Sequence, residues 1–109
     1  MELQAIQQKV DNWICRNGGY WPPLSMLAAI LEEAGEVARE INATEGPKVK
    51  REKIENAPKL REELADLFFA VICMNNYYHI DMEKEILAII SKYEQRDINR
   101  FSKNNQNSK

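Results

Sequence analysis

The sequence is poor in residues that interrupt secondary structure and in long apolar runs. It contains only four glycines and four prolines among 109 residues, and no apolar run approaches the 18 residues of a membrane-spanning helix. Its N-terminus lacks the charged-then-apolar layout of a secretory signal. We therefore expect a cytoplasmic protein with no membrane partner.

A basic excess and a cysteine framework are also missing. The formal net charge is -2, which disfavours a protein that binds nucleic acid polymers. In a reducing cytosol we expect the two cysteines, Cys15 and Cys73, to stay unpaired. With 44% hydrophobic and 29% charged residues, the composition favours one small globular domain over residues 1–101, followed by a flexible polar tail at 102–109.

Hydrophobic spacing predicts an all-α chain with no strand. Apolar residues recur three or four positions apart in four segments. Two glycines and two prolines between residues 18 and 23 separate the first two segments, and Asp81 is placed to cap the last helix. We expect an antiparallel four-helix bundle with helices at about 2–15, 23–42, 58–78 and 82–101, and a short helical piece at 49–55 inside a lysine-rich connection at 48–59.

Two of these segments combine a core-like composition with acidic residues. AILEEAGEVAREI, residues 29–41, is apolar at most positions yet carries several glutamates, and LREELADLFFAVICM, residues 60–74, repeats the combination. A carboxylate among apolar side chains is costly to ionise unless it finds a partner. The two segments therefore need a common explanation for their acids.

Helical spacing lets each segment direct two carboxylates at one point. Glu33 and Glu36 are three residues apart, and so are Glu63 and Asp66. If the two helices cross antiparallel, four carboxylates converge inside the bundle. A hard divalent cation relieves their repulsion, and Mg²⁺ suits oxygen ligands of this kind.

Two features of the acidic segments stay open at this stage. Pairs that include Glu32 or Glu62 satisfy the same spacing, and all of these acids could instead lie on a solvated surface. Gly35 weakens its helix by about 1 kcal/mol relative to alanine, and we expect the close approach of another backbone to compensate.

The acidic pattern resembles the signature of a known enzyme family. EEAGE at 32–36, followed by ELAD at 63–66, is similar to the EExxE…ExxD signature of MazG-type nucleotide pyrophosphohydrolases, which belong to the all-α NTP pyrophosphatase superfamily. The similarity extends over residues 21–96. It implies Mg²⁺, with Mn²⁺ as a substitute, and a catalytic role for Glu32 beside the metal-binding acids. The implied metal ligands are Glu33, Glu36, Glu63 and Asp66, of which Glu33 and Glu36 are also implied in catalysis.

The resemblance also implies a reaction. Members of this family hydrolyse a nucleoside triphosphate to the monophosphate and pyrophosphate, which suggests house-cleaning of the nucleotide pool. One alternative is an enzyme similar to phosphoribosyl-ATP pyrophosphohydrolase. Another is a non-catalytic, metal-binding helical module that serves for interaction.

Aromatic and amide side chains near the acids are candidates to hold a nucleotide. Tyr20 and Trp21 lie in the loop before the first acidic segment, where they could stack on a base. Asn75 follows the second acidic segment and could read base or ribose edges. Trp13 lies on an apolar stripe and is expected in the core, and His79 is expected in a turn.

Two predictions concern phosphate binding and assembly. Lys92 and Arg96 are four residues apart on one face of the last helix, and the resemblance implies that they bind phosphate. Because helices that are apolar on more than one face would expose large patches in a monomer, we expect a homodimer or a homotetramer that completes the bundle.

Overall fold

The computed structural model describes residues 1–45 and 53–107, with side chains described over 1–45 and 59–98. Those residues form four helices and no strand, which confirms the all-α prediction. No helix in the described parts of the chain is long and apolar enough to span a membrane. The helices are α1 (Leu3–Arg16), α2 (Pro23–Glu45), α3 (Lys53–Tyr77) and α4 (Met82–Asn107).

Two helix boundaries differ from the prediction by five or more residues. Helix α3 begins at Lys53 and continues through Pro58, where we expected it to start. The part of the predicted piece at 49–52 lies outside the described residues. Helix α4 runs to Asn107, six residues beyond the predicted end near 101. The division into a domain at 1–101 and a tail at 102–109 stays a prediction.

The turns between helices follow from specific backbone signals. Helix α1 ends in a Schellman arrangement, because Gly18 adopts a positive φ of 106° and the Gly19 N–H donates to the Ile14 carbonyl. Helix α3 ends in the same way, with His79 at φ 56° and the Ile80 N–H donating to the Asn75 carbonyl. His79 therefore lies in a turn, as the sequence predicted.

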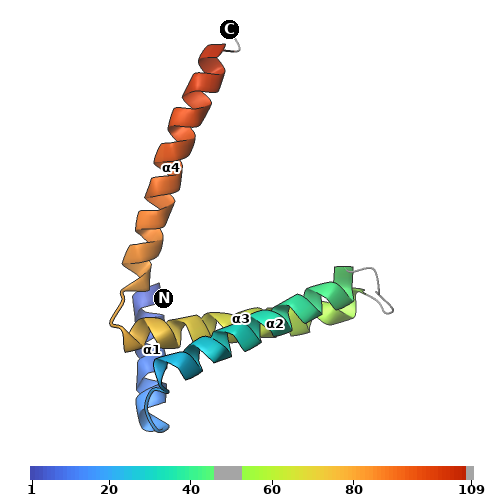
Figure 1. Cartoon of the computed structure of the whole chain (residues 1–109), viewed down its shortest axis with the longest axis vertical. Helices are drawn as coiled ribbons and strands as arrows, with labels where there is room; N and C mark the ends of the chain where they lie inside the picture. The colour runs from blue at the N-terminus through green and yellow to red at the C-terminus, as the bar shows by residue number, and fades with distance from the viewer. Residues whose placement is uncertain (46–52, 108–109) are drawn as a thin grey trace.

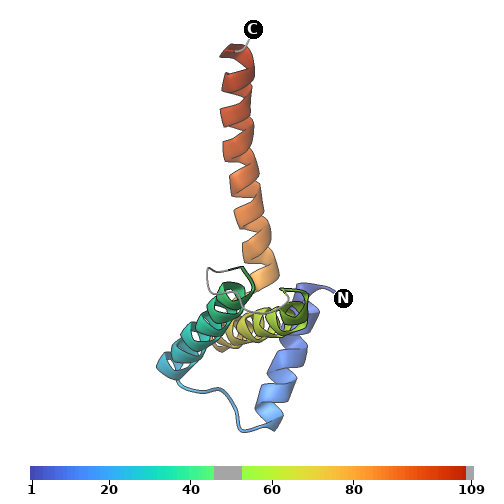
Figure 2. The same cartoon turned by 90° about the vertical axis from the view of Figure 1, so that its right-hand side faces the viewer.

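Helices α2 and α3 lie side by side over most of their length, and α1 crosses α3 (Figures 1 and 2). The small core between α1 and α3 contains Val10, Ile14 and Ile72. Helix α4 leads away from the α2–α3 pair and contacts mainly the start of α1. The acidic segments of α2 and α3 therefore face each other, while α4 stands apart from them in the single chain.

One buried glutamine fixes where α4 begins. The Gln7 side chain donates to the Asn76 side chain and to the Ile80 carbonyl, and it accepts the Met82 N–H. The Asp81 carboxylate accepts the Lys84 N–H, which confirms Asp81 as the cap of α4. These bonds tie the α3–α4 turn to α1.

Candidate active site

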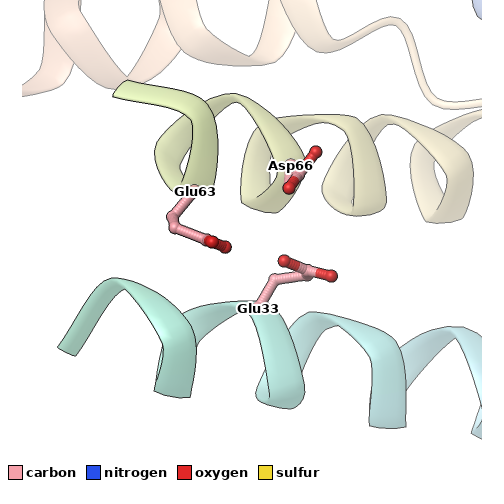
Figure 3. A group of neighbouring side chains, drawn as sticks. All are labelled: Glu33, Glu63 and Asp66. Carbon is pink, nitrogen blue, oxygen red and sulfur yellow. The ribbon is translucent and has the colours of Figure 1, made fainter. Parts of the chain in front are cut away.

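Three carboxylates meet between α2 and α3. Glu33 of α2 faces Glu63 and Asp66 of α3, and one oxygen from each lies within 4.8 Å of the others (Figure 3). The spacing of three residues in α3 places both of its acids toward α2. We call Glu33, Glu63 and Asp66 the acid cluster. The facing helices thus bring together three of the four predicted metal ligands.

The acids of the cluster repel one another. Partial burial raises the pKa of the Glu33 carboxyl, and repulsion from Asp66, Glu36 and Glu32 raises it further. The pKa of the Glu63 carboxyl is raised by the same causes, with Glu36 as the strongest charged neighbour. The protein thus holds these acids together against their mutual repulsion.

The fourth predicted ligand, Glu36, lies beside the cluster and has another partner. Its carboxylate forms an ion pair with Arg39, with 2.7 Å between Oε2 and Nη2. Glu36 still lies near enough to raise the pKa of Glu63. Glu32 is exposed on the same helix, and its charge acts on Glu33. The five acids implied by the sequence therefore form one group, with Glu36 turned toward Arg39.

The donor set of the acid cluster fits a hard divalent cation. It supplies only carboxylate oxygens, drawn from two facing helices, in a site that is partly open to solvent. A positive ion would lower the pKa of Glu33 and Glu63 and relieve the repulsion between them. Oxygen ligands of this type suit Mg²⁺ and Mn²⁺ better than metals that prefer nitrogen or sulfur.

A pocket of about 330 Å³ adjoins the acid cluster. Glu33 and Asp66 form part of its wall, so the acids and the pocket share an edge. Most of the remaining wall is aromatic or apolar, which suits a flat heterocyclic ring. It comprises Trp13, Ile14, Asn17, Gly19, Tyr20, Trp21, Met26, Ala29, Phe69, Ala70 and Cys73.

Three aromatic side chains give the pocket its shape. Trp13 stands edge-on to Phe69, with ring centroids 5.9 Å apart. The Tyr20 hydroxyl donates to the Asp11 carboxylate, and burial and this bond raise its pKa. The prediction that Trp13 belongs to the core is wrong, because 51% of its surface is exposed. Trp13 lines the pocket instead, although it shares the apolar stripe of α1 with the buried Val10 and Ile14.

The other predicted substrate residues divide into two groups. Tyr20 and Trp21 line the pocket, as their loop position suggested. Asn75 is buried and does not line it, and its side-chain nitrogen has no hydrogen-bond partner among the described residues. Lys92 and Arg96 lie on α4, which leads away from the acid cluster.

Sequence reasoning missed several pocket residues. Phe69 and Cys73 lie three and seven positions after Asp66 and therefore share its helical face, which was the available signal. Asn17 was not identifiable in this way. Its side-chain nitrogen donates to the Trp13 carbonyl, and it reaches the pocket only because α1 ends there.

Comparison with known proteins shows the family of the chain. Residues 22–101 match the family model described as the MazG nucleotide pyrophosphohydrolase domain. The chain belongs to the MazG family. The chain is 34% identical over 102 residues to the uncharacterised protein YpjD of Bacillus subtilis (strain 168), covering 93% of this chain and 91% of YpjD.

Two solved structures show the same MazG fold. The crystal structure of YpjD from Bacillus subtilis superposes with a TM-score of 0.78 at 34% identity, covering 85% of this chain and 95% of that one. The Bacillus-conserved MazG protein, described as a nucleotide pyrophosphohydrolase, gives a TM-score of 0.73 at 34% identity, covering 85% and 90%. The predicted MazG-type fold is thereby confirmed, and the chain is a nucleotide pyrophosphohydrolase, a hydrolase of phosphoanhydride bonds.

Proposed function

We propose that this MazG protein is a Mg²⁺-dependent pyrophosphohydrolase that cleaves deoxynucleoside or nucleoside triphosphates to monophosphates and pyrophosphate. The observation that carries the proposal is the shared edge between the acid cluster and the aromatic pocket. A base in the pocket places the first phosphates of its nucleotide next to the acids. The geometry therefore favours cleavage at the α–β anhydride over cleavage at the terminal phosphate.

The pocket residues would bind the base through their ring faces. Trp13, Tyr20, Trp21 and Phe69 offer surfaces on which any base can stack, and stacking on an aromatic side chain contributes about 1–3 kcal/mol per base. This wall carries few polar groups that could distinguish one base from another. We accordingly propose a nucleotide class and a house-cleaning role rather than one base.

The acids would hold the metal and handle the proton. We assign metal binding to the acid cluster together with Glu36. Bound Mg²⁺ would neutralise phosphate oxygens and increase the acidity of the attacking water. Glu32 lies next to this group, is exposed and acts electrostatically on Glu33. We assign it the role of accepting the proton of that water.

The reaction balances as a simple hydrolysis. The water oxygen forms a bond to the α-phosphorus. The bond between the α-phosphorus and the α–β bridging oxygen breaks, and pyrophosphate leaves. The electron pair of the broken bond stays on the bridging oxygen, and the proton of the water passes to the carboxylate. No oxidant, reductant or second substrate is needed.

We further propose that the protein works as a homodimer or homotetramer. Helix α2 turns Met26, Glu33 and Glu40 toward α3, yet it carries a second apolar stripe about 130° round the helix. That stripe recurs every three or four residues, as in helix–helix interfaces. It consists of Leu24, Leu27, Leu31, Ala34, Ala38 and Ile41. Apolar residues on the outer faces of the helices are exposed in the single chain: Leu24, Leu27, Leu31 and Ile41 of α2, Leu64 and Phe68 of α3, and Ile86, Leu87, Ile90 and Tyr93 of α4.

Pyrophosphate release from a panel of nucleoside and deoxynucleoside triphosphates with Mg²⁺ tests the proposed activity. We expect release from at least one nucleotide, and a loss of at least about a hundredfold in kcat for Asp66→Asn, because an amide cannot replace a carboxylate ligand. Glu94→Gln, an exposed acid on α4, is the matched control and should keep full activity.

Two results would contradict the proposal. The absence of pyrophosphate from every nucleotide, with a folded protein, would refute the activity. Full turnover by Asp66→Asn and by Glu63→Gln would refute the metal assignment. Including phosphoribosyl-ATP in the panel distinguishes the alternative enzyme that the sequence left open.

A further inference from the structure

The pocket residues, the acids and an arginine follow one another in order along α2. Met26 and Ala29 line the pocket, Glu33 belongs to both the pocket and the acid cluster, and Glu36 follows one turn later. Arg39 comes one turn after Glu36, six residues and about 9 Å along the helix axis from Glu33. Pocket, acids and arginine therefore succeed one another along a single helix.

Helix α3 shows the same order in the opposite chain direction. Cys73 and Phe69 line the pocket, Asp66 lies at its edge, and Glu63 lies one turn farther from it. A nucleotide whose base fills the pocket would therefore extend its phosphates past Glu33 and Asp66 toward Glu63 and Arg39. The terminal phosphates are the part of the substrate nearest to Arg39 along the helix axis. Arg39 lies about 120° round α2 from Glu33, so its long side chain has to turn toward the acids to meet these phosphates.

Arg39 is placed to change partners. It is the one cation in ion-pair contact with a site acid among the residues whose side chains the structure describes. The side chain is 69% exposed, so it can turn with little loss of packing. A cation held by the acids would compete with Arg39 for the Glu36 carboxylate, and a released guanidinium is a good bidentate partner for phosphate.

We propose that Arg39 binds the β- and γ-phosphates of the substrate and the pyrophosphate that leaves, exchanging its ion pair with Glu36 for the phosphates. This rests on the proposed function, since it assigns the far end of the same nucleotide. Charge on the bridging oxygen increases as the α–β bond breaks, and a guanidinium at the leaving group stabilises it. The arginine thus selects triphosphates over monophosphates.

Binding of the two products separates this role from a structural one. Calorimetric titrations with Mg²⁺ present would compare inorganic pyrophosphate with the monophosphate of the best substrate, in wild type and Arg39→Gln. We expect pyrophosphate affinity to fall about ten- to hundredfold, as expected for a lost charge-assisted contact. Monophosphate affinity should be unchanged, and Arg39→Lys should recover part of the pyrophosphate affinity.

A metal titration and a control variant complete the test. Mn²⁺ affinity measured without nucleotide should be unchanged or tighter in Arg39→Gln, because the metal no longer competes with Arg39 for the Glu36 carboxylate. Lys9→Gln, an exposed lysine on α1, should match wild type throughout. Equal pyrophosphate affinity in Arg39→Gln and wild type, or equal weakening of both products, would refute the role of Arg39. Lack of turnover by wild type would instead refute the proposed function.

Discussion

Trp13 shows how closely core and site positions resemble each other at the level of single residues. It has helical spacing with Val10 and Ile14, which are buried, yet half of its own surface is exposed. Its ring contacts Phe69 edge-on and forms a wall of the pocket. One residue of α1 thus both contacts Phe69 of α3 and lines the pocket.

Replacing Trp13 with alanine should affect nucleotide binding more than stability. We expect KM for the best nucleotide to rise about tenfold, because a stacking surface of roughly 1–3 kcal/mol is lost. Thermal unfolding and steady-state kinetics would be measured together, with Ile72→Ala as the core comparison. If Trp13 were mainly a core residue, the variant would lose stability as Ile72→Ala does while KM stayed constant.

The raised pKa of Glu63 predicts a pH-dependent stability in the metal-free protein. A carboxyl with a raised pKa binds protons more readily in the folded state, so its favourable contribution is present at low pH and lost as pH rises through the folded pKa. In chelator, the Tm of wild type should decline relative to that of Glu63→Gln as pH rises from about 4.5 to 7. Parallel Tm curves for the two proteins would contradict this.

At the scale of one helix, Gly35 behaves differently from the expectation. We expected a neighbouring backbone to approach it, but a Cβ built at Gly35 meets no atom within 4 Å among the described parts of the chain. The expected compensation is therefore not found among the residues that the structure describes. Within that part of the chain, no close neighbour offsets the helix-weakening effect of Gly35.

Gly35→Ala should stabilise the protein by about 0.5–1 kcal/mol, because alanine is the better helix former and no contact opposes its methyl group. Urea unfolding at fixed protein concentration measures the change. The exposed neighbour Ala34→Gly is the reverse control and should lose a similar amount. Destabilisation by Gly35→Ala would show that something packs against this face in solution.

The whole chain is too extended to be a self-contained globule. Its radius of gyration is 18.9 Å, whereas a compact chain of this length has about 13 Å. Figure 1 shows the cause, since α4 projects from the rest of the molecule. Its Ile86, Ile90 and Tyr93 keep 45–48% of their surface exposed among the described residues. A second copy is the partner we propose for these faces.

Leu31→Glu should disrupt that assembly. Leu31 is 65% exposed in the single chain, and a charge there would be buried without a partner in an interface. Light scattering after gel filtration should give a dimer or tetramer for wild type and a smaller species for Leu31→Glu. The control Gln8→Glu changes an exposed residue of α1 and should behave as wild type. A wild-type monomer at tens of micromolar would contradict the proposed oligomer.

The sequence by itself determined the all-α class, the capping residue Asp81, the spacing of the acids within each helix and the family, because each depends on patterns read along the chain. It could not determine side-chain roles that depend on packing between helices. Tertiary structure decided that Trp13 faces a pocket, that Asn75 is buried, and that Lys92 stands apart on α4. It also paired Glu36 with Arg39. Helical periodicity fixes which residues share a face, but only the crossing of the helices fixes what each face meets.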